Sequence, residues 1–222
     1  MKPGVRGESR PKHMGQGHEP LSKVVADALR GAIISGRYKP QERLVEDRIS
    51  EELGVSRVPV REALKALAGE GIVDLRPRRG AWVTAISADV ARELVEVRAT
   101  LEGMNARLAA RHHENAIVEQ LKQVLARGNA AAEKGITGEL VGLNSEFHDL
   151  LARAGSNSVL FDIMRSLRDR TNLVFAANSA PRAKEDWREH SAILSAVICG
   201  DEQLAELLAT RHVLSAAAAR LK

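Results

Sequence analysis

Apolar residues recur at intervals of three and four positions along most of the chain, which is the spacing of amphipathic helices. The first such segment begins at Leu21 and ends at Gly36. The second runs from about Leu44 to Leu53 and is closed by Gly54, and a third begins only two positions later. Two helices joined by so short a turn predict a helix-turn-helix.

The pattern changes to short β-prone runs after the third helix. Residues 72–75 and 81–84 are such runs, and they flank the turn sequence Pro-Arg-Arg-Gly at 77–80. These residues predict a β-hairpin with a basic tip. Helical spacing then returns and predicts six amphipathic helices, at residues 87–111, 114–134, 138–153, 157–178, 182–199 and 201–220. The predicted fold class is mainly α, ending in an all-α helical bundle.

Composition narrows the class of protein. The chain has 222 residues, of which 44% are hydrophobic and 28% charged, as in ordinary globular proteins. It contains no run of about 18 uncharged apolar residues and no apolar segment in the first 20, so we expect a cytoplasmic protein without a membrane span or signal peptide. Cys199 is the only cysteine, which excludes an intramolecular disulfide, and we expect it to be a small core residue.

Charge is distributed unevenly between the two halves. Residues 1–85 carry 16 Lys and Arg against 11 Asp and Glu, whereas residues 86–222 carry 17 against 18. Residues 1–20 are rich in Gly, Pro and basic residues without apolar periodicity, which predicts a flexible basic arm. A basic front half suits a part of the protein that meets a polyanion.

One face of the third predicted helix is basic. Arg57, Arg61 and Lys65 follow one another at intervals of four, and Ser56 is placed to cap the helix through its hydroxyl. Arginine on such a helix can pair with guanine in the major groove of DNA, while other cations hold phosphates. A basic stripe is often only a solvated helix face. Here the helix-turn-helix and the arginine-tipped hairpin favour DNA binding.

The segment from Leu21 to Val83 closely resembles the winged-helix DNA-binding domain of GntR-family transcriptional regulators. The run LGVSRVPVREALKALAGEGIVDLRPRRGAWV carries much of this resemblance. The segment from Leu21 to Val83 departs from the family at Val58, where Thr is usual, and at Gln41, where Gly is usual. The resemblance implies that a recognition helix and a wing touch DNA through Ser56, Arg57, Arg61, Arg78, Arg79 and Gly80, and Lys65 continues the same stripe.

Three predicted helices in the second half carry a histidine each: His148, His190 and His212. A single histidine on an amphipathic helix is most often a polar-face or hydrogen-bonded core residue. Three of them on separate helices of a bundle can converge on a metal ion, and Asn144 lies one turn before His148. Spacing alone leaves both interpretations open.

Residues 95–110, 143–157 and 189–212 resemble the FCD ligand-binding domain of the FadR subfamily of GntR regulators. The resemblance implies a divalent metal held by Asn144, His148, His190 and His212, although many members have Asp at the first position. Neutral imidazole and amide donors suit Zn²⁺, Ni²⁺ or Mn²⁺ and leave the site positive, which favours a small carboxylate effector.

Arg98 and Glu102 lie four positions apart on the first bundle helix. They are interpreted in two ways: as an ion pair on the helix surface, or, as the family resemblance implies, with Arg98 pointing inward to bind the carboxylate of the effector. Arg98 is therefore a candidate effector-binding residue.

Together these patterns predict a ligand-responsive repressor that binds a two-fold DNA operator as a homodimer. The expected division is a basic arm at 1–20, a winged helix-turn-helix domain at 21–85 and an all-α effector- and metal-binding domain at 86–222. The alternative is a metal-dependent hydrolase that uses the same histidines. No carboxylate accompanies them in an arrangement such as HExxH, and Asp149 points about 100° away from its neighbour His148 on a helix. We therefore do not expect an enzyme.

Overall fold

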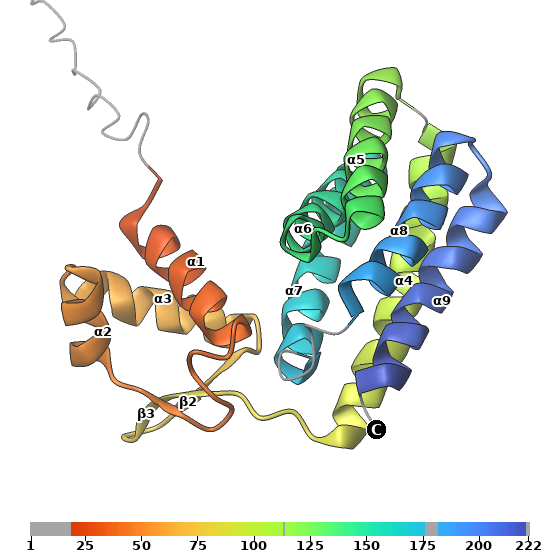
Figure 1. Ribbon diagram of the computed structural model, residues 1–222. Coiled ribbons are helices and arrows are strands. Elements are labelled where there is room, and N and C mark those ends of the chain that lie inside the picture. Colours follow the sequence, from red (N-terminus) through yellow and green to blue (C-terminus); the bar gives the residue numbers. More distant parts are fainter. Residues whose placement is uncertain (1–18, 113, 176–181, 221–222) are drawn as a thin grey trace, which may run out of the picture.

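The computed structural model describes residues 19–112, 114–175 and 182–220 (Figure 1). Its N-terminal unit, called the winged helix below, consists of α1 (Leu21–Ile34), β1 (Arg43–Leu44), α2 (Glu46–Leu53), α3 (Arg57–Gly69), β2 (Val73–Arg76) and β3 (Gly80–Val83). Helix α1 packs against α3, whose apolar side is buried at Val60, Leu64 and Leu67. Gly54 ends α2 with a φ of 64°, in the left-handed region that glycine favours, and leads directly into α3. The predicted helix-turn-helix is confirmed.

The hairpin extends into a three-stranded antiparallel sheet in the order β1-β3-β2. The second helix was predicted from Leu44, but Arg43 and Leu44 pair with Trp82 and Ala81, and α2 begins at Glu46. Leu44 is apolar because its side chain enters the core of the winged helix, as a strand residue. Strand β1 therefore ties the wing to the start of α2.

Gln41 leads into strand β1 in a left-handed conformation, with a φ of 64°. Its backbone N–H donates a hydrogen bond to the carbonyl of Val83 at 3.0 Å. A position with this φ favours glycine, which explains why the family usually has Gly here.

The second unit, called the bundle below, consists of α4 (Ala88–His112), α5 (Asn115–Lys134), α6 (Thr137–Ala154), α7 (Ser158–Phe175), α8 (Ala183–Ile198) and α9 (Glu202–Arg220). Helices α4 and α9 lie side by side along most of their length, and α7 is the bundle helix that contacts α1 (Figure 1). Phe147, Leu143 and Leu194 belong to the apolar core between the helices. The mainly α fold class is confirmed.

One detail of the sequence interpretation changes here. Cys199 is exposed just beyond the end of α8, so the prediction of a core cysteine is wrong. The reason is that α8 ends at Ile198 and the chain turns outward before α9. Within the described residues, no helix combines the length and apolarity that crossing a membrane requires.

Gly128 on α5 lets Trp187 of α8 pack directly against the helix backbone. A Cβ atom at this position would lie 1.8 Å from the indole ring. We expect Gly128→Ala to lower the free energy of unfolding by about 1–3 kcal/mol, since the large ring must move within a packed core. Urea denaturation measures the change. The control is Gly142→Ala on α6, where a Cβ meets no atom within 4 Å, and it should be neutral or slightly stabilising.

Candidate functional site

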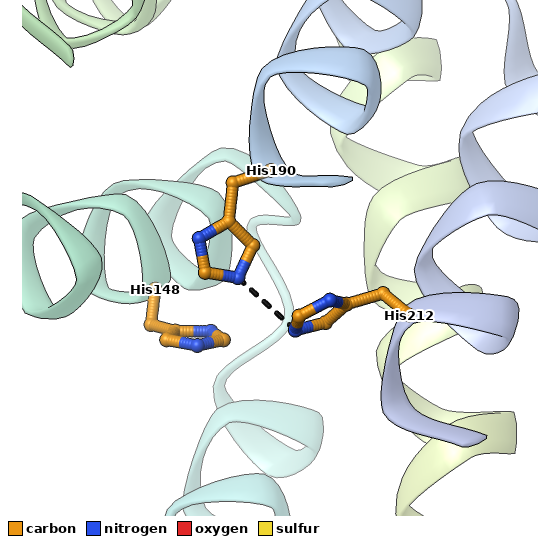
Figure 2. A group of neighbouring side chains, drawn as sticks. All are labelled: His148, His190 and His212. Atoms are coloured by element: carbon orange, nitrogen blue, oxygen red, sulfur yellow. Dashed lines mark hydrogen bonds between the residues drawn. The ribbon is translucent and has the colours of Figure 1, made fainter. Parts of the chain in front are cut away.

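Three histidines converge in the bundle from helices that are far apart in the sequence. His148 comes from α6, His190 from α8 and His212 from α9, and all three side chains are buried (Figure 2). Their candidate ligand nitrogens all lie within 4.8 Å of one another. The Nε2 atoms of His190 and His212 are 3.0 Å apart. The structure thus brings together the three histidines that sequence spacing could not place.

Glu189 controls the orientation of His212. Its Oε2 atom lies 2.6 Å from Nδ1 of His212, so the carboxylate accepts a hydrogen bond from Nδ1–H in the tautomer that leaves the lone pair on Nε2, which faces His190. Two nitrogens 3.0 Å apart can both lie about 2.1 Å from a single ion. Phe147 stacks on the His190 ring with centroids 4.0 Å apart, which fixes that imidazole. The donor set therefore fits a divalent metal.

A second group of possible ligands, Asp186, Glu189 and His212, lies beside the first. Its two carboxylates are already contacted by a cation, because Arg182 lies 3.2 Å from both Asp186 and Glu189. This arrangement favours a role in supporting His212 over a separate metal site.

Burial disfavours the protonated forms of His148 and His190. It lowers the pKa of His148 well below the usual value, and the nearby cations Arg168 and Arg98 lower it further. Burial likewise lowers the pKa of His190, with smaller contributions from His212 and His148. Neutral imidazole is the form that binds a metal, so the site is ready for one near neutral pH.

These pKa shifts give the metal-free protein a pH-dependent stability. His148 and His190 stay neutral when folded, whereas in the unfolded chain each takes up a proton near pH 6.5. Below that pH the unfolded state binds more protons, so the free energy of unfolding should fall by about 1.4 kcal/mol per pH unit for each histidine. Denaturation between pH 7.5 and 5, with a chelator present, measures the slope. His148→Gln should lower this slope by the contribution of one histidine. An unchanged slope would contradict the conclusion that His148 stays neutral in the folded protein.

Arg98 and Glu102 form a buried ion pair on α4. Nε of Arg98 lies 2.7 Å from Oε1 of Glu102, and Nη1 donates to Oγ1 of Thr171 on α7, also at 2.7 Å. Burial raises the pKa of Glu102, but Arg98 and Arg168 more than offset this and hold that pKa below its usual value. The interpretation as a surface pair is therefore wrong, because α4 is covered along this side by α7 and α9.

Arg98 also faces a cavity of about 180 Å³ beside the histidines. The cavity is lined by Arg98, Asn144, His148, Asn172, His212 and Ile34, among others. Asn144 lies half-buried on α6, one turn before His148. Asn144, His148 and His212 thus share one cavity with Arg98, and His190 completes the histidine cluster beside it. The roles of Glu189, Arg168 and Thr171 were not foreseen, since helical spacing gives no signal for contacts between different helices.

The basic stripe of α3 is exposed but not free of partners. Arg61 makes a two-pronged ion pair with Glu46 of α2, with a shortest distance of 2.8 Å, and Arg57 lies 2.5 Å from Asp47. Lys65 is exposed on the same face. Both arginines are therefore already paired with carboxylates of α2.

Ser56 occupies the N-cap position of α3, but among the described residues its hydroxyl makes no capping hydrogen bond. The predicted cap is therefore wrong in its side-chain contact, and the exposed hydroxyl faces solvent.

The tip of the hairpin presents its cations outward. Arg78 and Arg79 are exposed, and Gly80 follows with a φ of 92°. A groove between α3 and this tip is lined by Arg61, Lys65, Arg78 and Gly80, among others. Four of the predicted DNA-contacting residues therefore line one groove, and Ser56, Arg57 and Arg79 are exposed on the same winged helix.

A winged helix with such a surface, joined to a helical bundle that encloses a polar cavity, defines the class of two-domain DNA-binding regulators. Residues 21–83 match the bacterial regulatory proteins of the gntR family, and residues 93–215 match the FCD domain. The chain therefore belongs to the GntR family of transcriptional regulators and carries an FCD domain.

Curated relatives of the chain are also transcriptional regulators. The HTH-type transcriptional repressor RspR of Escherichia coli K12 is 29% identical over 88% of this chain and 86% of its own. The Glc operon transcriptional activator of the same strain is 30% identical over 87% of this chain and 86% of its own. The solved structure of E. coli McbR/YncC covers 91% of this chain and 97% of its own with a TM-score of 0.77, at 22% identity. Family and relatives indicate a transcriptional regulator and not an enzyme.

Proposed function

We propose that this protein is a cytoplasmic repressor of the FadR subfamily. Its affinity for operator DNA is controlled by a small carboxylate bound in the bundle. The observation that carries the proposal is one cavity lined by the imidazoles of His148 and His212 and by the buried guanidinium of Arg98, with His190 beside them in the histidine cluster. In this view residues 21–85 bind DNA and residues 86–222 bind the effector. Most of the proposed basic arm, residues 1–18, lies outside the described residues.

In the bundle, His148, His190 and His212 would hold one divalent ion, Zn²⁺, Ni²⁺ or Mn²⁺, with Asn144 as a fourth donor. None of these neutral donors cancels the charge of the ion, so when bound it supplies a positive centre for an anion. Arg98 is placed by Glu102 and Thr171 to bind the same anion through a charge-assisted hydrogen bond. A small carboxylate meets both requirements.

On the winged helix, Arg57 and Arg61 would read base edges and Lys65 would hold a phosphate. Ser56 would contribute its exposed hydroxyl. Arg78, Arg79 and Gly80 would flank the helix at the wing, where the glycine lets the backbone approach DNA closely. Support comes from the exposure of these residues and from the groove that Arg61, Lys65, Arg78 and Gly80 line together.

A thermal-shift screen of small carboxylates tests the effector proposal. A ligand that binds only the folded protein raises the melting temperature by mass action. We expect at least one carboxylate to raise it in protein loaded with Zn²⁺, and to raise it much less in the same protein treated with a chelator. Shifts that are equal with and without metal would contradict a metal-bound effector.

We also expect a homodimer, because a single module of this kind buries too little surface on DNA for tight and specific binding. Light scattering at micromolar concentration should give twice the mass of the chain. A monomer that binds a single half-site with full affinity would contradict the proposal.

A further inference from the structure

One residue of the winged helix contributes to the lining of the cavity in the bundle. Ile34, the last residue of α1, lines it together with Asn172 and Phe175 of α7. Any molecule that fills the cavity therefore touches the DNA-binding unit as well as the bundle. A change in the position of α1 relative to α7 would alter the shape of the cavity.

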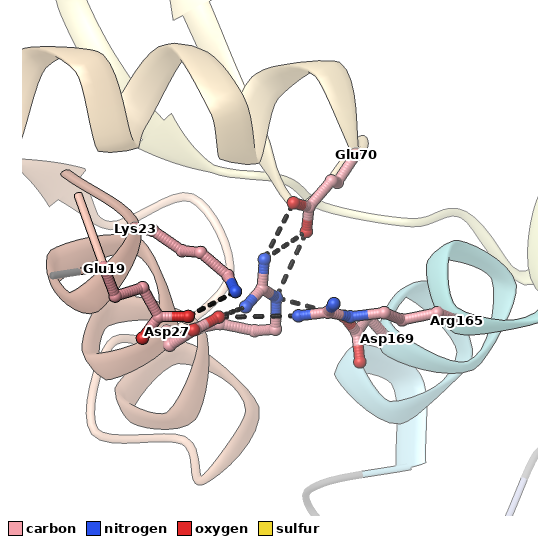
Figure 3. Close-up of polar contacts among 7 residues, drawn as sticks. Glu19, Lys23, Asp27, Glu70, Arg165 and Asp169 are labelled. Atoms are coloured by element: carbon pink, nitrogen blue, oxygen red, sulfur yellow. Dashed lines mark hydrogen bonds and ion pairs between the residues drawn. The ribbon is translucent and has the colours of Figure 1, made fainter. Parts of the chain in front are cut away.

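The same two helices are joined by buried charges. Arg30 of α1 contacts both Glu70 and Asp169, with its Nη2 atom 2.7 Å from Glu70 and its Nε atom 3.2 Å from Asp169 of α7. Figure 3 labels these two acidic residues together with Asp27 and Arg165. The side chains of Arg30 and Asp169 are only 11% and 13% exposed. Opening the contact would separate the largely buried Asp169 from Arg30, while Arg30 would keep Glu70 and Asp27 as partners in its own unit.

Glu70 connects this junction to the recognition helix, because it is the C-cap residue of α3. Ser166 of α7 donates a hydrogen bond from its hydroxyl to the backbone carbonyl of Glu70 at 3.3 Å. Arg165 of α7 lies 3.4 Å from Asp27 of α1. One face of α7 therefore holds both α1 and the end of α3.

The neighbouring face of α7 lines the ligand site. Thr171 accepts the hydrogen bond from Arg98, and Asn172 lines the cavity. Asn172 lies three positions after Asp169, about 60° from it around the helix, whereas Thr171, two positions after Asp169, lies on nearly the opposite side. A shift or rotation of α7 caused at one face must move the groups on the other.

We propose that α7 couples the cavity of the bundle to the recognition helix, through the Asp169–Arg30–Glu70 chain and the Ser166–Glu70 hydrogen bond. The identity of the ligand in this inference rests on the proposed function. The contacts between α7 and the winged helix do not depend on it. A ligand that favours one position of α7 biases the orientation of the winged helix. By linkage, DNA that favours one orientation changes the affinity for the ligand by the same factor.

Hydrogen exchange of the full chain, followed by mass spectrometry, tests the contacts directly. The variant is Asp169→Asn, which keeps the size of the side chain and removes its charge. We expect amides at the end of α1 and at the end of α3 to exchange at least about fivefold faster, because Arg30 loses a buried partner in the other unit. The control is Asp162→Asn, an exposed aspartate on the same helix, which should leave these amides unchanged. Unchanged exchange in Asp169→Asn would overturn the proposal.

Zn²⁺ alone serves as the ligand in a second comparison. In the wild-type chain it should slow exchange in the bundle and also at the ends of α1 and α3. In Asp169→Asn it should protect only the bundle. Protection confined to the bundle in the wild type would overturn the coupling while leaving the metal site intact. If Zn²⁺ protects no segment, the metal site fails, and the exchange rates of Asp169→Asn decide whether α7 holds the winged helix.

Discussion

Replacing His190 by alanine is expected to lower the affinity for the divalent metal by more than about a hundredfold, because even outer-shell partners of metal ligands contribute ten- to a hundredfold. The His190 ring lies at the centre of the cluster, with Nε2 3.0 Å from that of His212 and its face on Phe147. The response to the effector should disappear with the metal. DNA binding should persist, because the winged helix has a core of its own. Elemental analysis of the purified protein measures the bound metal.

The matched control for this experiment is His112→Ala, which removes an exposed histidine at the end of α4. Its metal content should equal that of the wild type. If His190→Ala retains as much metal as this control, the three histidines are hydrogen-bonded core residues and the metal proposal is wrong.

Replacing Arg61 by alanine should weaken specific DNA binding by about 1–3 kcal/mol and relax the preference at one base pair, the cost of losing one guanine contact. Arg79→Ala at the wing should weaken binding to operator and random duplex by similar factors, as expected for a phosphate contact. Titration of both variants against both duplexes, at one salt concentration, separates these effects.

The control for charge alone is Arg92→Ala on α4, an exposed arginine outside the winged helix. It removes the same charge and should leave the ratio of operator to random affinity unchanged. An Arg61→Ala protein that keeps its full preference for the operator over random duplex would contradict the assignment of α3 as the recognition helix.

Local spacing was enough to predict the helices, because each has a buried face that repeats every three or four residues. It could not predict β1, whose two residues form a strand only by pairing with Trp82 and Ala81 much later in the chain. Leu44 was counted as the first residue of a helix because an apolar residue beside an amphipathic run looks the same in either state. The exposure of Cys199 was missed for a similar reason, since a helix end depends on where the chain turns.

The candidate site was predicted by residue type but not by geometry. Family resemblance supplied the ligand histidines, and only the packing of α6, α8 and α9 brings them within 4.8 Å. The Arg98–Glu102 pair has the same spacing on an exposed or a buried helix, so its burial depends on neighbouring helices. Glu189 stands next to His190 in the sequence yet supports His212 on another helix.

The placement of the two tryptophans gives each unit a natural fluorophore of its own. Trp82 lies in the wing, with the guanidinium of Arg76 4.6 Å from its ring centroid, whereas Trp187 is buried in the bundle with its ring centroid 6.5 Å from that of His190. The sequence contains no other tryptophan. A variant that keeps only one of the two tryptophans therefore reports by fluorescence on one unit alone, Trp82 on the wing and Trp187 on the surroundings of the histidine cluster.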